Sequence, residues 1–208
     1  MSTAIIGVGN IGRTLATLLV ANGETVVLAA TTPPETVAKE LGELASAATT
    51  AEAIDACDVV ILAVWFDVMR TLVEQHQSRL VGKVIVDPCN PISVDDQGRF
   101  TRTLPDTESA GSIIAAALPP GAHYVKAFPT LGAELLQSSA NRAPERAVVL
   151  YATDDEQAES AVQKLITAAG FTPLRAGGVA AALRLEAFGD LSARVLDLAA
   201  ARTAINHR

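Results

Sequence analysis

Short apolar runs alternate with helical patterns along this chain. The run Ala4-Ile5-Ile6 is followed by apolar residues at a helical spacing, namely Ile11, Leu15, Leu18 and Leu19. The apolar runs show no polar alternation, which is typical of strands buried on both faces of a parallel sheet. The pattern therefore predicts buried strands that are separated by amphipathic helices.

The alternation continues through the first half of the chain. We expect strands at 4–8, 25–30, 45–48, 58–64 and 83–87, and helices at 11–22, 34–42, 51–56 and 67–80. Asn22-Gly23 is suited to end the first helix, and Pro33-Pro34 to begin the second. Such alternation predicts a parallel sheet covered by helices on both faces.

The second half begins with a polar, turn-rich stretch, residues 90–107, which we expect to form an excursion at the carboxyl edge of the sheet. Beyond it the patterns predict helices at 107–118, 155–169 and 179–203, and strands at 123–128, 147–151 and 171–175. No linker, repeat or low-complexity tract interrupts the sequence, so the later strands are expected to extend the first sheet.

A glycine-rich loop, Gly7-Val8-Gly9-Asn10-Ile11-Gly12, joins the first predicted strand to the first predicted helix. In this position one glycine permits the tight turn, one lets the backbone approach a pyrophosphate, and one lets helix and strand pack closely. The helix amino terminus then offers unpaired N–H groups to the phosphates. A glycine turn in an unrelated α/β protein is the alternative. We expect a dinucleotide site that includes Gly7, Gly9, Asn10, Ile11 and Gly12.

The predicted fold class is α/β, a doubly wound and mostly parallel Rossmann sheet. We expect one domain over residues 1–208, with a dinucleotide-binding core at 1–130 and an extension of the same sheet at 131–208. A chain of 208 residues has room for one such core and little for a second.

Ligands of open parallel sheets bind outside the carboxyl ends of the strands. The loops that follow the other strands therefore supply further candidate cofactor-binding residues: Thr31, Thr32, Ala63, Val64, Trp65, Asn90, Ala127, Phe128 and Pro129. The end of the second strand carries no acidic residue, which would repel the 2′-phosphate of NADP, and Thr31 and Thr32 can donate to that phosphate. NADP is thus favoured over NAD, although Thr32 alone fits a solvated turn equally well.

No side chain is singled out as an acid, a base or a metal ligand. His76, His123 and His207 are interpreted as structural or solvated, and no metal-ligand spacing or nucleophile elbow occurs. Cys89 is interpreted as a small residue that fills space rather than as a redox thiol. Hydride transfer between two stacked rings needs no acid or base, so such a site is chemically sufficient.

The net charge of -7 and the lack of clustered Lys and Arg argue against nucleic acid and anionic membranes as partners. The residues Met1-Ser2-Thr3 lack the positive region of a signal peptide, and no apolar run could cross a bilayer. We therefore expect a cytoplasmic protein. Cys57 and Cys89 are expected at opposite ends of the sheet, too far apart for a disulfide.

The sequence resembles the NADP-dependent reductases of the deazaflavin coenzyme F420. The resemblance is carried, in order, by Gly7 to Gly12, Asp58 to Asp67, Asp87 to Pro91, Val125 to Glu134, Gly170 to Leu174 and Leu185-Glu186. It implies hydride transfer between the nicotinamide of NADP and a deazaflavin or flavin ring, in homodimers. Three departures concern the acceptor and the phosphate: Pro129 replaces an Asn, Arg175 to Val179 replaces an Asp-x-Gly-Pro-Leu segment, and threonine replaces an arginine after the second strand.

The expected function is that of an NADP(H)-dependent oxidoreductase with a deazaflavin, a flavin or a similar small acceptor. The alternative is a non-catalytic NADP-binding redox sensor. We expect a homodimer formed through the last helix, with Leu183, Val195 and Leu198 among its apolar positions.

Overall fold

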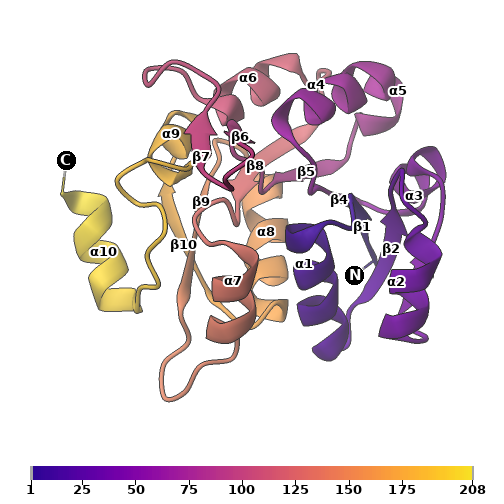
Figure 1. The fold of residues 1–208 in the computed structure, drawn as a ribbon, viewed down its shortest axis with the longest axis horizontal. Helices are drawn as coiled ribbons and strands as arrows, with labels where there is room; N and C mark the ends of the chain where they lie inside the picture. Colours follow the sequence, from indigo (N-terminus) through magenta and orange to yellow (C-terminus); the bar gives the residue numbers. More distant parts are fainter. Residues whose placement is uncertain (1, 208) are drawn as a thin grey trace.

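An eight-stranded sheet in the order β10-β9-β8-β5-β4-β1-β2-β3 runs through the computed structural model, which describes residues 2–207 (Figure 1). Its strands are β1 Ser2–Ile6, β2 Thr25–Ala29, β3 Ala45–Ala47, β4 Val59–Leu62, β5 Val84–Asp87, β8 His123–Ala127, β9 Val148–Ala152 and β10 Thr172–Gly177. Neighbouring strands are parallel except for β8 and β9, which pair antiparallel. The predicted mostly parallel α/β sheet is confirmed.

Helices cover both faces of this sheet, as the buried strands require. On one face lie α1 Asn10–Ala21, α2 Pro34–Leu41, α7 Ala133–Ser139 and α8 Glu156–Ala168. On the other lie α3 Thr50–Ala56, α4 Phe66–Gln75, α5 Gln77–Leu80 and α6 Ala110–Ala117. A 3₁₀ turn at Val179–Ala181 and the helices α9 Ala182–Leu185 and α10 Leu198–Asn206 follow β10, and α9 and α10 pack on β9 and β10.

The strand order reverses between β1 and β4, because β1 pairs with β2 on one side and with β4 on the other. In open α/β sheets the ligand crevice lies at this reversal, outside the carboxyl ends of the strands. The loops after β1 and β4 therefore border the crevice, and the loops after β5 and β8 continue it along the same edge.

Most predicted helix ends agree with the structure. Helix α1 ends at Ala21, and Gly23 follows at φ +85°, where glycine carries no steric penalty. Helix α2 begins at Pro34, as expected. The predicted helix 67–80 is instead two helices that meet at His76, and α6 begins at Ala110 rather than at 107. Helix α7 has no counterpart among the predicted elements.

The predicted helix 179–203 is wrong. The chain leaves the helical path after Leu185, and residues 186–197 run as turns and extended segments before α10 begins. The physical cause is Glu186, which is fully buried and whose carboxylate accepts hydrogen bonds from Ser109 Oγ and from the N–H of Gly111. Helix α10 then begins anew at Asp197, which caps it by accepting from the N–H of Ala200.

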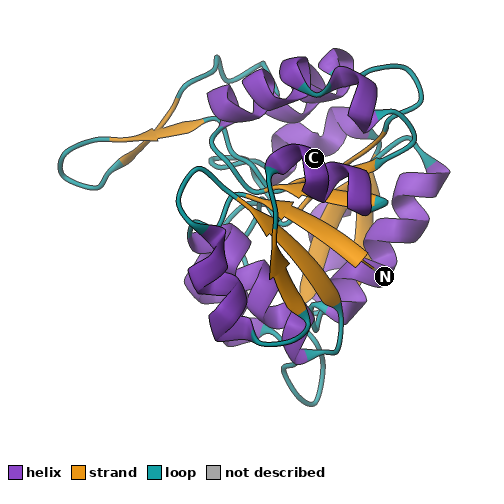
Figure 2. Ribbon diagram, turned by 90° about the vertical axis from the view of Figure 1, so that its right-hand side faces the viewer, coloured by secondary structure: helices purple, strands orange, loops and turns teal. Residues whose placement is uncertain are grey.

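The polar stretch after β5 forms a hairpin, β6 Ile92–Val94 and β7 Phe100–Arg102. We call residues 91–103 the arm, because Figure 2 shows them projecting from the body of the molecule. The arm begins at Pro91, whose carbonyl accepts from the N–H of Thr103. The expected excursion is thus an ordered hairpin.

Within residues 2–207, no helix combines the length and the apolar character needed to cross a lipid bilayer.

Candidate functional site

The three glycines of the loop after β1 differ sharply in the space around them. A Cβ added to Gly12 would lie 1.9 Å from the Gly7 carbonyl oxygen, and one added to Gly7 would lie 2.3 Å from that of Ala63. Gly7 also has φ +101°. A Cβ on Gly9 would meet no atom of the described residues within 4 Å. The fold therefore requires glycine at 7 and 12, whereas the space at Gly9 is open.

Helix α1 begins at this open position. Gly9 is its N-cap and provides no side chain, and the first intrahelical bond runs from the N–H of Arg13 to the Gly9 carbonyl oxygen. The N–H groups of Asn10, Ile11 and Gly12 consequently have no acceptor within the helix. The first turn contains no acidic residue. A bare helix amino terminus beside an open glycine fits a phosphate group.

The neighbouring loops supply an uncharged rim. After β4, Ala63 and Val64 are partly buried and Trp65 is 56 % exposed. After β2, Thr31 and Thr32 are both exposed and precede α2. Neither threonine is followed by an acidic residue until Glu35, in the first turn of α2. This side of the crevice therefore carries two exposed threonines and no carboxylate before Glu35.

Asn90 ties three loops together on the other side. Its Nδ2 donates to the Pro129 carbonyl oxygen over 2.9 Å, and its Oδ1 accepts from the N–H of Ala187 over 2.7 Å. Both polar ends of this side chain are thus engaged within the protein. Asn90 fixes the relative positions of the loop after β5, the loop after β8 and the segment after α9.

A buried ion pair lies directly beneath these loops. Lys126 Nζ donates to Asp87 Oδ2 over 2.9 Å and to the Cys89 carbonyl oxygen over 2.6 Å, and both charged side chains are 0 % exposed. Tyr124 donates its hydroxyl to the same carboxylate over 2.7 Å. Burial disfavours the charge on Lys126, but Asp87 and Glu186 outweigh it and raise the pKa of Lys126. The pair holds the start of the loop that carries Asn90.

The network extends to the arm through Glu186. Its Oε1 lies 3.8 Å from Lys126 Nζ, and its Oε2 accepts from Arg102 Nη2 over 3.2 Å. Arg102 Nη1 also donates to the Ala187 carbonyl oxygen over 3.3 Å. The base of the arm and the segment after α9 are therefore anchored to the same buried charges as the loop after β5.

Sequence reasoning did not select these four charged residues for the site. Lys126 and Asp87 stand inside apolar strands, where a charge without a partner would be strongly unfavourable, and this is the signal that could have found them. Arg102 and Glu186 offered no such signal, because each finds its partner more than 80 positions away.

The candidates of the loop after β8 are placed differently from those of the other loops. Ala127 and Phe128 are 0 % and 1 % exposed and belong to the core, and Pro129 is also buried. Phe128 adopts φ +67°, which turns the chain sharply at the carboxyl end of β8. These three residues therefore offer a ligand little exposed side-chain surface.

The histidines and cysteines lie as interpreted from the sequence. His123 is at the amino end of β8 and pairs with Asp155, the N-cap of α8, over 2.7 Å. Both thiols are free, and burial raises the pKa of Cys57 and of Cys89. Among residues 2–207, no three His, Cys, Asp or Glu side chains come close enough to hold a metal ion.

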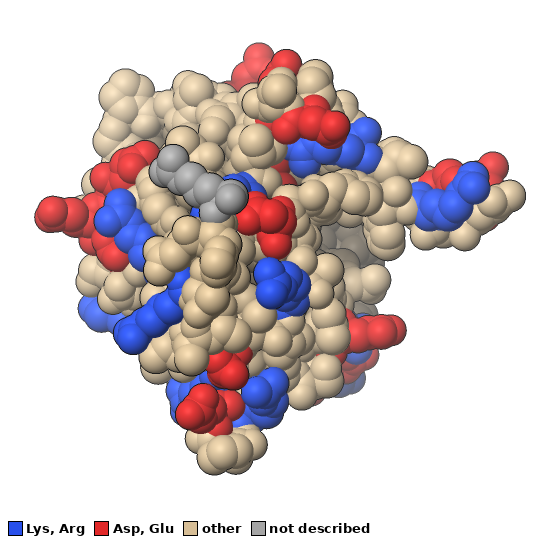
Figure 3. All heavy atoms as spheres, turned by 90° about the vertical axis from the view of Figure 1, so that its left-hand side faces the viewer, with Lys and Arg blue, Asp and Glu red and all other residues tan. Residues whose placement is uncertain are grey.

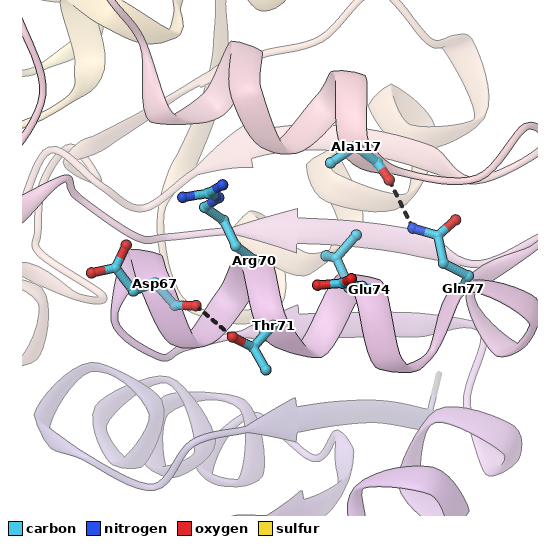
Figure 4. A pocket seen from close by; sticks show the side chains of 7 residues that line it. Asp67, Arg70, Thr71, Glu74, Gln77 and Ala117 are labelled. Atoms are coloured by element: carbon cyan, nitrogen blue, oxygen red, sulfur yellow. Dashed lines mark hydrogen bonds between the residues drawn. The ribbon is translucent and has the colours of Figure 1, made fainter.

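Figure 3 shows acidic and basic side chains interspersed on one face of the molecule, and the surface hollowed beside the base of the arm. A separate surface depression of about 500 Å³ lies between α4 and α6 (Figure 4). Its polar groups are partly engaged with each other, since Gln77 Nε2 donates to the Ala117 carbonyl oxygen and Thr71 Oγ1 to that of Asp67. It is lined by helix surfaces and not by the strand-end loops, so we do not assign it to the crevice.

Comparison with known proteins agrees with this geometry. Residues 2–91 match the family model described as NADP oxidoreductase, coenzyme F420-dependent. The metalloreductase STEAP3 of Rattus norvegicus is 31 % identical over 183 residues, which are 88 % of this chain and 35 % of that protein. The chain thus spans about a third of the length of this relative.

Solved structures share most of this fold. A hypothetical protein from Sinorhizobium meliloti superposes with a TM-score of 0.83 at 29 % identity and 95 % coverage of both chains. A protein from Arthrobacter sp. FB24, assigned as an F420-dependent NADP-reductase, superposes with a TM-score of 0.73 at 24 % identity, covering 87 % of this chain and 86 % of that one. The second likeness is one of fold. The family match confirms, over residues 2–91, the resemblance that the sequence motifs indicated.

Proposed function

We propose that this chain, whose residues 2–91 match the F420-dependent NADP oxidoreductases, transfers a hydride between NADP(H) and a deazaflavin, a flavin or a similar small acceptor. The coarser assignment, to the NADP-dependent oxidoreductases, follows from the family match. The acceptor is the part that we add. The observation that carries the proposal is a contrast among the three glycines. A Cβ at Gly9 would meet open space, whereas a Cβ at Gly7 or Gly12 would overlap a backbone carbonyl oxygen.

The residues at the reversal of strand order suit the dinucleotide. The open backbone at Gly9 and the N–H groups of Asn10 and Ile11 would bind the pyrophosphate. Thr31 and Thr32 would donate to the 2′-phosphate. Ala63, Val64 and Trp65 would line the middle of the crevice, and the loops that Asn90 joins would border its far end.

NADPH, when bound, would supply a hydride, which is a proton with two electrons, from C4 of its nicotinamide to the acceptor. The chain's own contribution is to orient two rings and to exclude water. The loops after β5 and β8 suit that task, because Asn90 and the buried Lys126–Asp87 pair fix them. No side chain in the proposed site is assigned as an acid or a base.

The test is an acceptor panel. Purified protein is mixed with NADPH and, in turn, a deazaflavin, FMN, a quinone and a ferric chelate, and NADPH oxidation is followed at 340 nm. We expect oxidation with the deazaflavin or FMN, and a much lower rate with NADH. A lack of oxidation with every acceptor refutes the proposed activity.

The redox-sensor alternative predicts a different pair of results. A sensor binds NADP(H) tightly, distinguishes its oxidised from its reduced form in calorimetry, and shows no acceptor-dependent turnover. Steady turnover with any acceptor removes this alternative.

We also propose that the protein forms a homodimer, which the family resemblance implied. The continuous helix on which we placed the contact does not exist, and Val195 and Leu198 pack within the chain. Sedimentation equilibrium that shows monomer alone refutes the proposed dimer.

A further inference from the structure

Phe188 is a large aromatic side chain held in an unfavourable backbone conformation on the surface. It is 66 % exposed and has φ +71°. It is the third residue of a tight turn that the N–H of Gly189 closes by donating to the Glu186 carbonyl oxygen over 2.8 Å. That position of a turn favours glycine, and a bulky residue with positive φ is a genuine outlier. Burial of the ring does not offset this strain, since the ring is mostly exposed.

Both backbone polar groups of Ala187, the residue before Phe188, are hydrogen bonded to side chains of other segments of the chain. Ala187 donates its N–H to Asn90 Oδ1 over 2.7 Å, and its carbonyl oxygen accepts from Arg102 Nη1 over 3.3 Å. Glu186, one residue earlier, is fully buried. Position 189 requires glycine, because a Cβ there would lie 2.4 Å from the Arg184 carbonyl oxygen. The surrounding structure therefore dictates where Phe188 is presented.

The turn that carries Phe188 adjoins the loops at the carboxyl ends of β5 and β8. Asn90, which holds Ala187, also holds Pro129, so Phe188 follows directly on the loops at the carboxyl ends of β5 and β8. These strands lie beyond β4 from the glycine loop, on the side of the sheet away from Thr31. Strain retained at such a position is typical of residues that contact ligands.

The base of the arm borders the same turn. Phe100 and Arg102 are two positions apart on β7 and so lie on one face of the arm, and Arg102 contacts the Ala187 carbonyl oxygen. Phe100 is 58 % exposed. The side of the arm that carries Arg102 thus also carries an exposed aromatic residue, although Phe100 is in ordinary extended backbone.

We propose that Phe188 forms the aromatic surface against which the hydride acceptor stacks, and that the acceptor is therefore a planar fused aromatic ring. This inference rests on the proposed function and deepens it, because it separates ring acceptors from metal chelates. Stacking on an exposed aromatic side chain is tolerant of ring substituents. Phe188 therefore selects the class of acceptor and leaves NADP(H) binding unaffected.

Three variants test the role of the ring. Phe188→Gly removes the ring and relieves the positive φ, so it is expected to unfold at the temperature of the unaltered protein or above it. Phe188→Trp keeps an aromatic surface. Leu44→Ala removes an exposed apolar side chain before β3, at the amino edge of the sheet, and serves as the matched control.

Two measurements separate the possible outcomes. Quenching of FMN fluorescence by the NADP⁺-loaded protein reports ring binding without turnover, and steady-state kinetics give KM for FMN and for NADPH. We expect Phe188→Gly to weaken FMN binding and to raise its KM about tenfold, with KM for NADPH unchanged. Phe188→Trp and Leu44→Ala are expected to stay within about twofold of the unaltered protein.

The inference fails if the unaltered protein binds or reduces FMN and Phe188→Gly does so equally well. It also fails if Phe188→Gly alters the sedimentation of the protein and not its FMN binding, because Phe188 then belongs to an interface between copies. Reduction of the ferric chelate alone overturns the inference and leaves the NADPH-dependent activity standing. If the protein does not oxidise NADPH with any of the acceptors and does not bind FMN, both proposals fail. The FMN-binding measurement identifies that case.

Discussion

Lys126 Nζ and Asp87 Oδ2 lie 2.9 Å apart, with both side chains wholly buried at the carboxyl ends of adjacent strands. The same ammonium group donates to the Cys89 carbonyl oxygen, one residue before Asn90. A charge pair in the interior is thus connected, through the backbone of Cys89, to the Asn90 amide that joins the loops of the crevice. Stability and the shape of the site depend on the same contact.

Lys126→Met is expected to destabilise the protein by about 3–5 kcal/mol, because it leaves the Asp87 carboxylate buried without its cation. Urea unfolding followed by circular dichroism measures the change. The double variant Asp87→Asn with Lys126→Met removes both charges and should recover part of the loss. A double variant destabilised by the sum of the effects of Lys126→Met alone and Asp87→Asn alone would show that the pair is not energetically coupled.

Gly9→Val and Gly12→Ala are expected to behave in opposite ways. The space at Gly9 is open and its φ of -70° suits any residue, so Gly9→Val should lower stability by about 1 kcal/mol or less, the value of a lost N-cap. Gly9→Val should abolish NADPH binding, because the valine side chain would occupy the phosphate position.

Gly12→Ala should lower the stability by about 1–3 kcal/mol, since its Cβ would overlap the Gly7 carbonyl. Calorimetric titration with NADPH and thermal unfolding measure both. A folded Gly9→Val that binds NADPH normally would remove the glycine loop from the site.

The sequence predicted those features that depend on neighbouring residues. Apolar runs define the strands, and the glycine spacing defines the loop, because both patterns are local. The position of α7 and the break after Leu185 were missed. The break depends on Glu186, whose partners Ser109 and Gly111 are about 75 positions away in the sequence. An apolar pattern that continues past Leu185 carries no sign of that contact.

The candidate site shows the same division. The residues selected after β1, β2 and β4 lie on the loops at the carboxyl ends of these strands, where we propose that the dinucleotide binds. After β8 the sequence selected Ala127 and Phe128, which the structure places in the core. Phe188 could not be selected, because its position at the crevice depends on the contact between Ala187 and Asn90, 97 positions apart.

Asp155 is expected to make the stability depend on acid pH. Burial works against its ionisation, but hydrogen bonds from the N–H of Ala158 and from His123 together lower the pKa of Asp155. A lowered folded-state pKa stabilises the protein above the unfolded pKa, about 3.9, and this contribution disappears as the pH falls through the folded pKa. Asp155→Ala should therefore cost about 1 kcal/mol at pH 7, and less below about pH 4.

Asp155→Asn is the matched control, because asparagine caps a helix as well as aspartate does and lacks the charge. Its stability should vary less with pH between 5 and 3 than that of the unaltered protein. Urea unfolding at each pH measures all three proteins. Equal pH dependence of the unaltered protein and Asp155→Asn would contradict the assignment.

The choice between NADP and NAD is expected to depend on Thr31. A carboxylate at this exposed position, after the carboxyl end of β2, would repel a 2′-phosphate, and Thr31→Asp should weaken NADPH binding about tenfold. NADH binding should be unchanged or stronger, because the new carboxylate can accept hydrogen bonds from the ribose hydroxyls.

Ser78→Asp is the control. It adds the same charge on α5, which precedes the amino end of β5, and it should leave both affinities within about twofold. Calorimetric titration with each dinucleotide gives the ratio, and raising the salt concentration should reduce the effect of Thr31→Asp, since exposed charges are screened. A Thr31→Asp protein that keeps its NADPH affinity, while Thr32→Asp loses it, would assign the phosphate contact to Thr32.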